Sequence, residues 1–99
     1  MQVIVRYKVK PECAQENKVL IRDVFAELAE TRPDGLHYAS FVAQDGVTFY
    51  HVAKVTTENN PLPETASFKA FQANLKDRCV EPPTPVQLEE VGSFRFDGS

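Results

Sequence analysis

One histidine of this chain stands at a position where the local pattern of residues predicts an apolar side chain. His51 falls in the middle of a strand-like run, and the nearest residues on the same face of that run, Phe49 and Ala53, are apolar. A partly buried imidazole, with an ordinary pKa of about 6.5, can remove a phenolic proton. His51 is therefore the candidate catalytic residue. The alternative is a core histidine whose hydrogen bonds hold the sheet in register.

A predicted hairpin sets the neighbours of this histidine. Two strand-like runs, 36–43 and 47–55, are separated by Gln44-Asp45-Gly46. Asp-Gly between such runs is a strong hairpin signal, because both residues can adopt positive φ in a two-residue turn.

Counting outward from Asp45 and Gly46 places two hydroxyl side chains on the face of His51. Ser40 lies opposite His51, and Tyr38 lies one pair further along. Ser40 could orient a bound ring, and Tyr38 is within side-chain reach. Both are therefore candidate substrate-binding residues.

Three phenylalanines are candidate walls of a pocket for a flat aromatic ligand. Phe49 shares the strand of His51, and Phe68 and Phe71 lie on one face of a predicted helix. The alternative for the helical pair is plain core, because apolar residues at a spacing of three and four are also what a buried helix face requires.

The remaining chemistry-bearing residues form no metal or cofactor site. His37 falls on the opposite face of the hairpin from His51, so the two cannot share a metal, and we expect His37 to be solvated at the rim. Cys13 and Cys79 make neither a disulfide framework nor a zinc site, and two inert thiols at one end of the domain are expected. The chain lacks a glycine-rich phosphate loop and a serine nucleophile elbow. We predict no cofactor.

Charged and polar side chains of the two predicted helices are expected on their outer faces. Asn17, Lys18 and Arg22 are assigned to the outside of the first helix. For Arg22 and Arg78 an anion-binding role is an alternative to a solvated surface position.

Along the whole chain, the pattern of apolar positions predicts six elements in the order β-α-β-β-α-β. This is the ferredoxin-like arrangement, an α+β fold with four antiparallel strands and both helices on one face. Gly92 is expected to form a bulge or bend in the last strand. Residues 1–96 are predicted to form one domain, and 97–99 a loose tail. The elements are a strand at 2–9, a helix at 14–31, the hairpin strands, a helix at 64–79, an extended proline-rich segment at 81–85 and a strand at 86–96.

Both faces of the predicted hairpin carry aromatic or branched side chains. Phe41 pairs with Tyr50 on the face opposite His51, and Ala39 pairs with Val52. Two helices can cover only one face of a four-stranded sheet, so the other face needs a cover. A second copy of the chain is the simplest one, which predicts a homodimer.

Composition narrows the partners and the compartment. The 99 residues, enough for one domain, include 14 acidic and 11 basic side chains and have a net charge of −3. This balance argues against nucleic acid or an anionic membrane as a partner, since both need a concentrated basic surface. No apolar run is long enough to span a membrane, and the few cysteines favour a reducing, cytoplasmic location.

The sequence resembles the antibiotic biosynthesis monooxygenase family of dimeric α+β barrels over residues 2–96. The resemblance rests on the element order, the two-sided sheet and the strand Thr48-Phe49-Tyr50-His51-Val52-Ala53. The segments Asn60-Pro61-Leu62-Pro63 and Phe68-Lys69-Ala70-Phe71-Gln72 resemble small bacterial proteins related to that family.

This resemblance implies a homodimer with a pocket between sheet and helices in each protomer. Some members of the family oxygenate hydroquinones or anthrones without metal, flavin or haem, because the substrate carbanion itself reduces oxygen. Others degrade haem with an Asn, a His and a Trp, and the absence of Trp from this chain argues against that branch. Diffuse motifs of this kind speak for the fold more than for the activity.

Two functional hypotheses follow. The first is a cofactor-independent monooxygenase that acts on a small aromatic or quinol-type substrate, with His51 as the base and Tyr38 and Ser40 as positioning groups. The second is a non-catalytic small-molecule-binding or assembly domain of the same fold. The substrate and the openness of the pocket depend on tertiary packing.

Overall fold

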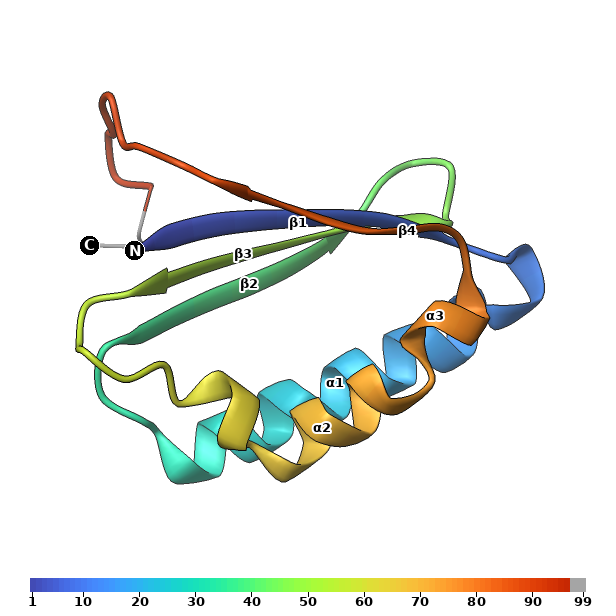
Figure 1. Ribbon diagram of the computed structural model, residues 1–99, viewed down its shortest axis with the longest axis horizontal. Helices are drawn as coiled ribbons and strands as arrows, with labels where there is room; N and C mark the ends of the chain where they lie inside the picture. Colours follow the sequence, from blue (N-terminus) through green and yellow to red (C-terminus); the bar gives the residue numbers. More distant parts are fainter. Residues whose placement is uncertain (97–99) are drawn as a thin grey trace.

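The computed structural model describes residues 1–96, so the predicted tail at 97–99 lies outside the described residues. One antiparallel sheet of four strands has the order β2-β3-β1-β4, and the helices lie together along one of its faces (Figure 1). The ferredoxin-like prediction is confirmed. The elements are β1 (Gln2–Val9), α1 (Ala14–Thr31), β2 (Leu36–Val42), β3 (Thr48–Val55), α2 (Ala66–Ala73), α3 (Leu75–Arg78) and β4 (Cys79–Gln87), with short 3-10 turns at Pro11–Cys13 and Leu62–Glu64.

The central strand and the long helix follow their sequence patterns. Alternation along β1 turns Tyr7 and Val9 toward the helices, where both are fully buried, while Arg6 is exposed on the other side. Helix α1 ends at Arg32, whose φ of 46° is left-handed and whose backbone N–H bonds to the carbonyl of Leu28. Pro33 follows and cannot continue the helix.

The predicted hairpin register is confirmed, but the turn has a different form. Ser40 pairs with His51, as the count outward from the turn predicted. Within the turn Gly46 has a positive φ of 78° and Asp45 does not. Instead, the Asp45 carboxylate accepts hydrogen bonds from the backbone N–H groups of Val47 and Thr48, each at 2.9 Å. The Asp-Gly pair therefore sets the register through a side-chain cap.

The second helix is shorter than predicted. A helix over 64–79 was expected, but the helix breaks at Asn74, whose φ of −123° and ψ of 22° are not helical. This residue separates α2 from the single turn of α3. The backbone N–H groups of Ala66 and Ser67, at the start of α2, donate to the carboxylate of Glu27 on α1. That contact satisfies the helix start from a neighbouring element.

The last strand is also placed differently. It runs from Cys79 to Gln87 and includes the proline-rich segment, whereas residues 88–96 form no strand. The predicted strand at 86–96 was wrong, because the extended proline-rich segment at 81–85 is itself part of β4 and the strand ends at Gln87. Strand β4 lies at the edge of the sheet, and an edge strand tolerates residues that lack an N–H donor. Gly92 therefore lies outside any strand and forms no bulge within one.

The core lies between the helices and one sheet face, and the other face is open. The buried cluster includes Tyr7, Val24, Phe49 and Phe71. On the opposite face Phe41 is 54% exposed. In Figure 1 no helix lies on that side of the strands. Among residues 1–96, no helix has the length and apolar character needed to cross a membrane.

Candidate functional site

His51 is buried, and both of its ring nitrogens have hydrogen-bond partners within the protein. Only 6% of the residue is exposed. Its Nε2 lies 2.7 Å from the hydroxyl of Tyr7. Its Nδ1 lies 2.6 Å from Ser40 Oγ and 3.0 Å from the hydroxyl of Tyr38. The sequence-predicted residues Tyr38, Ser40 and His51 are therefore brought together.

The network continues beyond Tyr7 through residues that the sequence analysis placed elsewhere. Asn17 Nδ2 donates to the Tyr7 hydroxyl at 2.9 Å, and Arg78 Nε donates to Asn17 Oδ1 at 3.1 Å. Asn17 is fully buried and Arg78 is 3% exposed, so the prediction that both lie on the surface was wrong. The guanidinium also donates to the carbonyl of Phe71 at 2.8 Å.

The sequence did contain a signal for these buried polar residues. Asn17 stands four and seven positions before Ile21 and Val24, and thus on the apolar stripe of α1. Arg78 stands three positions after the buried Leu75, on the inner face of the second helical segment. Polar residues at these core positions require buried partners, which each supplies to the other.

Aromatic rings hold the imidazole from both sides. Tyr7 stacks on His51 with ring centroids 5.3 Å apart, and Tyr38 stacks on its other side at 5.9 Å. Phe71 packs against His51 at 5.5 Å in a tilted arrangement. Phe25 extends the stack beyond Tyr38 at 5.2 Å. The ring of His51 is thus fixed in place and shielded from water.

Burial determines the protonation of this cluster. It lowers the pKa of His51 to about 4, because an imidazolium would lose its hydration in the core. Burial likewise raises the pKa of Tyr38 to about 12, against the opposing hydrogen bond from Ser40. It raises the pKa of Tyr7 further, although the hydrogen bond from Asn17 opposes the rise. At neutral pH the cluster therefore consists of a neutral imidazole and protonated hydroxyls.

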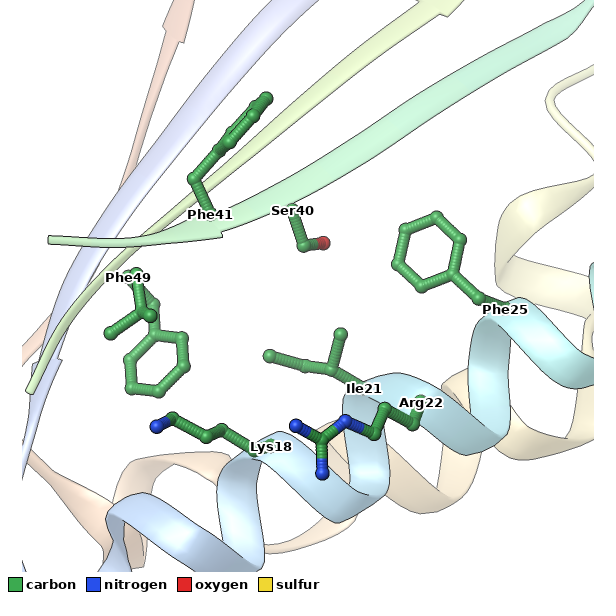
Figure 2. Close-up of a pocket in the computed structure, with 8 residues that line it drawn as sticks. Lys18, Ile21, Arg22, Phe25, Ser40, Phe41 and Phe49 are labelled. Carbon is green, nitrogen blue, oxygen red and sulfur yellow. The ribbon is translucent and has the colours of Figure 1, made fainter. Parts of the chain in front are cut away.

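A cavity of about 450 Å³ lies beside this cluster, between α1 and the hairpin. In Figure 2, Ser40 points into it from β2, while Lys18 and Arg22 reach toward it from α1. Phe41 is on the opposite side of the strand. Ser40 is the member of the network that lines this cavity. The lining residues are Lys18, Ile21, Arg22, Phe25, Ser40, Phe41, Val42 and Phe49.

A second hollow of about 700 Å³ continues along the same helix and strand. Phe25 lines both spaces, and Tyr38 lines the second one. Phe25, stacked on Tyr38, therefore lies between the two hollows.

The predicted aromatic walls divide into two groups. Phe49 lines the cavity. Phe71 is part of the buried core and Phe68 packs against it, with ring centroids 6.0 Å apart. Neither lines the cavity beside Ser40, so the core alternative describes their packing.

The other titratable residues are placed away from the site. His37 is exposed on β2, on the face opposite His51. Cys13 and Cys79 are free and half-buried at the same end of the domain, where Lys10 N donates to the carbonyl of Arg78. Burial raises the pKa of Cys79, with Arg78 opposing and Cys13 adding to the rise. Within residues 1–96, no three His, Cys, Asp or Glu side chains are grouped to hold a metal ion.

Solved structures identify the class of this fold. A protein from Nitrosomonas europaea, provisionally named an antibiotic biosynthesis monooxygenase, superposes with a TM-score of 0.74 and 19% identity over 91% of this chain and 88% of its own. A Caulobacter crescentus protein with the same provisional name gives 0.69 and 23% identity over 92% and 89%. A Nitrosomonas europaea protein of unknown function gives 0.72 and 14% identity over 94% and 90%.

The chain therefore has the fold of the proteins named antibiotic biosynthesis monooxygenases, as the resemblance of its sequence indicated. No family model matches the chain. No curated protein matches it by sequence. Sequence identities at this level support a shared architecture, and the activity has to be inferred from the site itself.

Proposed function

We propose that this protein is a cofactor-independent oxygenase that acts on a small aromatic substrate in the cavity between α1 and the hairpin. One observation carries the proposal: an aromatic-lined cavity ends on a serine hydroxyl that is hydrogen-bonded to a buried, neutral histidine. The fold shared with proteins named as monooxygenases supports the same conclusion. Phe25 and Phe49 offer apolar surface to a flat ring.

The chemistry needs no redox group from the protein. A ring-activated CH₂ group loses a proton to water, with the Ser40 hydroxyl at the substrate oxygen that takes up the negative charge, and the resulting carbanion reduces O₂. One CH₂ and one O₂ become one C=O and one H₂O, so the four electrons of the two C–H bonds balance the four that oxygen accepts. The protein must hold the substrate in its electron-rich form and keep it oriented.

Ser40 and His51 divide this work. Ser40 separates His51 from the cavity, so Ser40 Oγ is the group that meets the substrate oxygen, and His51 acts through it. The predicted role of His51 as the base needs a free lone pair, and both ring nitrogens are engaged with Tyr7 and Ser40. We therefore propose that His51 positions the Ser40 hydroxyl.

Oxygen uptake by metal-free protein tests the proposal. Anthrones and substituted hydroquinones are supplied to the wild type, Ser40→Ala and His51→Ala, with His37→Ala as the control on the opposite face. We expect protein-dependent uptake that falls about 100-fold or more in the first two variants, the range for loss of proton-transfer or oxyanion contacts. Uptake by folded His51→Ala equal to the wild type would remove the histidine from the mechanism.

The second hypothesis, a non-catalytic small-molecule-binding domain, is supported by a different observation. Both nitrogens of His51 are satisfied inside the protein, as a structural histidine requires. This hypothesis predicts no uptake with any substrate, and a ligand that copurifies in the cavity. Native mass spectrometry of freshly purified protein detects such a ligand.

We also propose that the open sheet face pairs with a second copy of the chain. Phe41 and Val86 are more than half exposed there, with Ile4, Tyr50 and Val52 half-buried between them. An apolar face of this kind is costly in water.

The free thiols of Cys13 and Cys79 support the proposed cytoplasmic location.

A further inference from the structure

We propose that the cavity beside Ser40 binds aromatic oxyanions, carboxylates or phenolates, with the charged oxygen on the Ser40 hydroxyl and Lys18 and Arg22 alongside. The inference rests on the proposed function only in placing the ligand in this cavity. It is argued from the direction of the buried hydrogen bonds and from the charges that line the cavity.

Arg78 determines which group donates and which accepts in each hydrogen bond of the network. A guanidinium can only donate hydrogen bonds, so Asn17 Oδ1 must be the acceptor of the 3.1 Å contact. The amide orientation of Asn17 follows, and its Nδ2 donates to the hydroxyl oxygen of Tyr7. The oxygen of Tyr7 is therefore an acceptor on the Asn17 side, and its own hydrogen must be donated elsewhere.

The hydrogen of Tyr7 determines the tautomer of His51. Within residues 1–96, the acceptor available to this fully buried hydroxyl is His51 Nε2, 2.7 Å away. Nε2 must then carry the lone pair, and the proton of the neutral imidazole lies on Nδ1. The opposite tautomer would leave the Tyr7 hydrogen buried without an acceptor, which is unfavourable.

The chain of donors ends at the cavity. Nδ1–H of His51 donates to Ser40 Oγ at 2.6 Å, so the hydrogen of Ser40 is left to be donated in turn. The other hydroxyl at Nδ1 is that of Tyr38, 3.0 Å away. A negatively charged oxygen in the cavity is a stronger acceptor than a neutral phenol and takes this hydrogen when bound. The site thus offers a donor, not a lone pair, to its ligand.

The charges around the cavity favour the same ligand. Lys18 and Arg22 stand one turn apart on α1 and both line it, and no acidic side chain does. The single ion pair within residues 1–96 joins Arg6 to Glu81 on another part of the sheet. Lys18 and Arg22 therefore lack a carboxylate partner, and in Figure 2 their side chains lie along α1 on the side of the cavity across from Ser40.

Matched probes test the ligand class. Binding of 2-naphthoate and of its neutral analogue 2-naphthamide is measured by amide chemical shifts, which also locate the probe near Phe25 and Phe49. We expect 2-naphthoate to bind about tenfold more tightly. We expect this preference to disappear in the double variant Lys18→Gln/Arg22→Gln and to persist in Lys69→Gln, a control on the exposed face of α2. Equal binding of both probes, or no binding at millimolar concentration, rules out a carboxylate site.

A second probe, 4-nitrophenol, distinguishes a site for phenolates from a site for carboxylates. Bound 4-nitrophenol reports its ionisation by absorbance, and preferential binding of the anion lowers its apparent pKa. A lowered pKa together with weak naphthoate binding identifies a phenolate site, and the reverse identifies a carboxylate site. An unchanged pKa together with equal binding of naphthoate and naphthamide contradicts the inference.

The tautomer has its own test. The chain contains two histidines, so His37→Gln leaves His51 as the single imidazole in a ¹⁵N spectrum. We expect the proton on Nδ1, and Asn17→Leu to weaken this preference. A proton on Nε2 of His51 in the folded protein overturns the relay.

The results of these binding tests can be distinguished from the result of the oxygen-uptake test of the proposed function. Selective oxyanion binding without oxygen uptake leaves a binding protein and retains the inference. Oxygen uptake with neutral aromatics that bind as tightly as anions retains the oxygenase and removes the inference.

Discussion

At Tyr7 a single hydroxyl group joins the two halves of the buried network. It accepts from Asn17 and contacts His51 Nε2, and the residue is fully buried. Buried polar groups are costly mainly when they lose their partner, so the consequence of removing one atom can be calculated in sign and approximate size.

Replacing Tyr7 by Phe should lower the free energy of unfolding by about 1–3 kcal/mol, because the side-chain groups of Asn17 and His51 lose their partner without gaining water. Urea titration measures the change. Thr31→Val, which removes a hydroxyl at an exposed position of α1, is the control and should change stability by about 0.5 kcal/mol or less. Equal effects of the two substitutions would contradict the network.

The depressed pKa of His51 predicts a pH dependence of stability. The pKa falls from 6.5 to about 4 on folding, so the unfolded chain binds more protons between these values. Stability is therefore complete above about pH 6.5 and falls as the pH drops toward 4, by about 3 kcal/mol at most. Urea titrations across this range measure the slope.

His51→Gln supplies the control for that slope. The free energy of unfolding of this variant should not change between pH 6.5 and 4, although it should be lower than that of the wild type at each pH. Asp45 contributes in a lower window, because its pKa falls from 3.8 to about 2 through hydrogen bonds from Thr48 and Val47. A slope that persists in His51→Gln above pH 4 would assign the effect to another group.

At the level of the elements, two glycines serve the connections around the hairpin for different reasons. Gly35 and Gly46 both have a φ of 78°. A Cβ on Gly35 would come within 2.8 Å of Thr57 Oγ1, whereas a Cβ on Gly46 would meet nothing within 4 Å. The first glycine is needed for conformation and for space, and the second for conformation alone.

Gly46→Ala should cost about 1 kcal/mol, which is the penalty for a left-handed residue. Gly35→Ala should cost more, because Thr57 must also move. In a Thr57→Ala background the difference between the two alanine substitutions should narrow. Thermal unfolding of the wild type, the three single variants and the two double variants completes the comparison, and a difference unaffected by Thr57→Ala would place the clash elsewhere.

At the level of the whole molecule, a monomer leaves the apolar side chains of one sheet face in water. Four strands are covered by helices on one side (Figure 1), and Phe41 is 54% exposed on the other. Phe41 also lines the cavity beside Ser40. Pairing of two copies would thus bury an apolar face and cover one edge of the site.

Sedimentation equilibrium at micromolar concentration should give twice the mass of the chain. Phe41→Glu should shift the protein to monomer, because a carboxylate buried between the two sheet faces would be unpaired and dehydrated. Val19→Glu, at an exposed position on α1, should remain dimeric. A monomeric wild type would contradict the proposed pairing.

Local patterns in the sequence determined the element order, the hairpin register and the pairing of Ser40 with His51. These features depend on residues a few positions apart, since alternation and turn chemistry act over one hairpin. The position of β4 was missed for a related reason. Whether prolines can join a strand depends on its place at the sheet edge, which no local pattern contains.

Tertiary structure alone decided what surrounds the histidine. Arg78 meets Asn17 across 61 positions of sequence, and Tyr7 meets His51 across 44. Each residue by itself has an ordinary solvated or core interpretation, and only the packing of α1, α3 and two strands joins them into one directed chain of hydrogen bonds. The cost of burying an unpaired polar group is the physical reason that they must be found together.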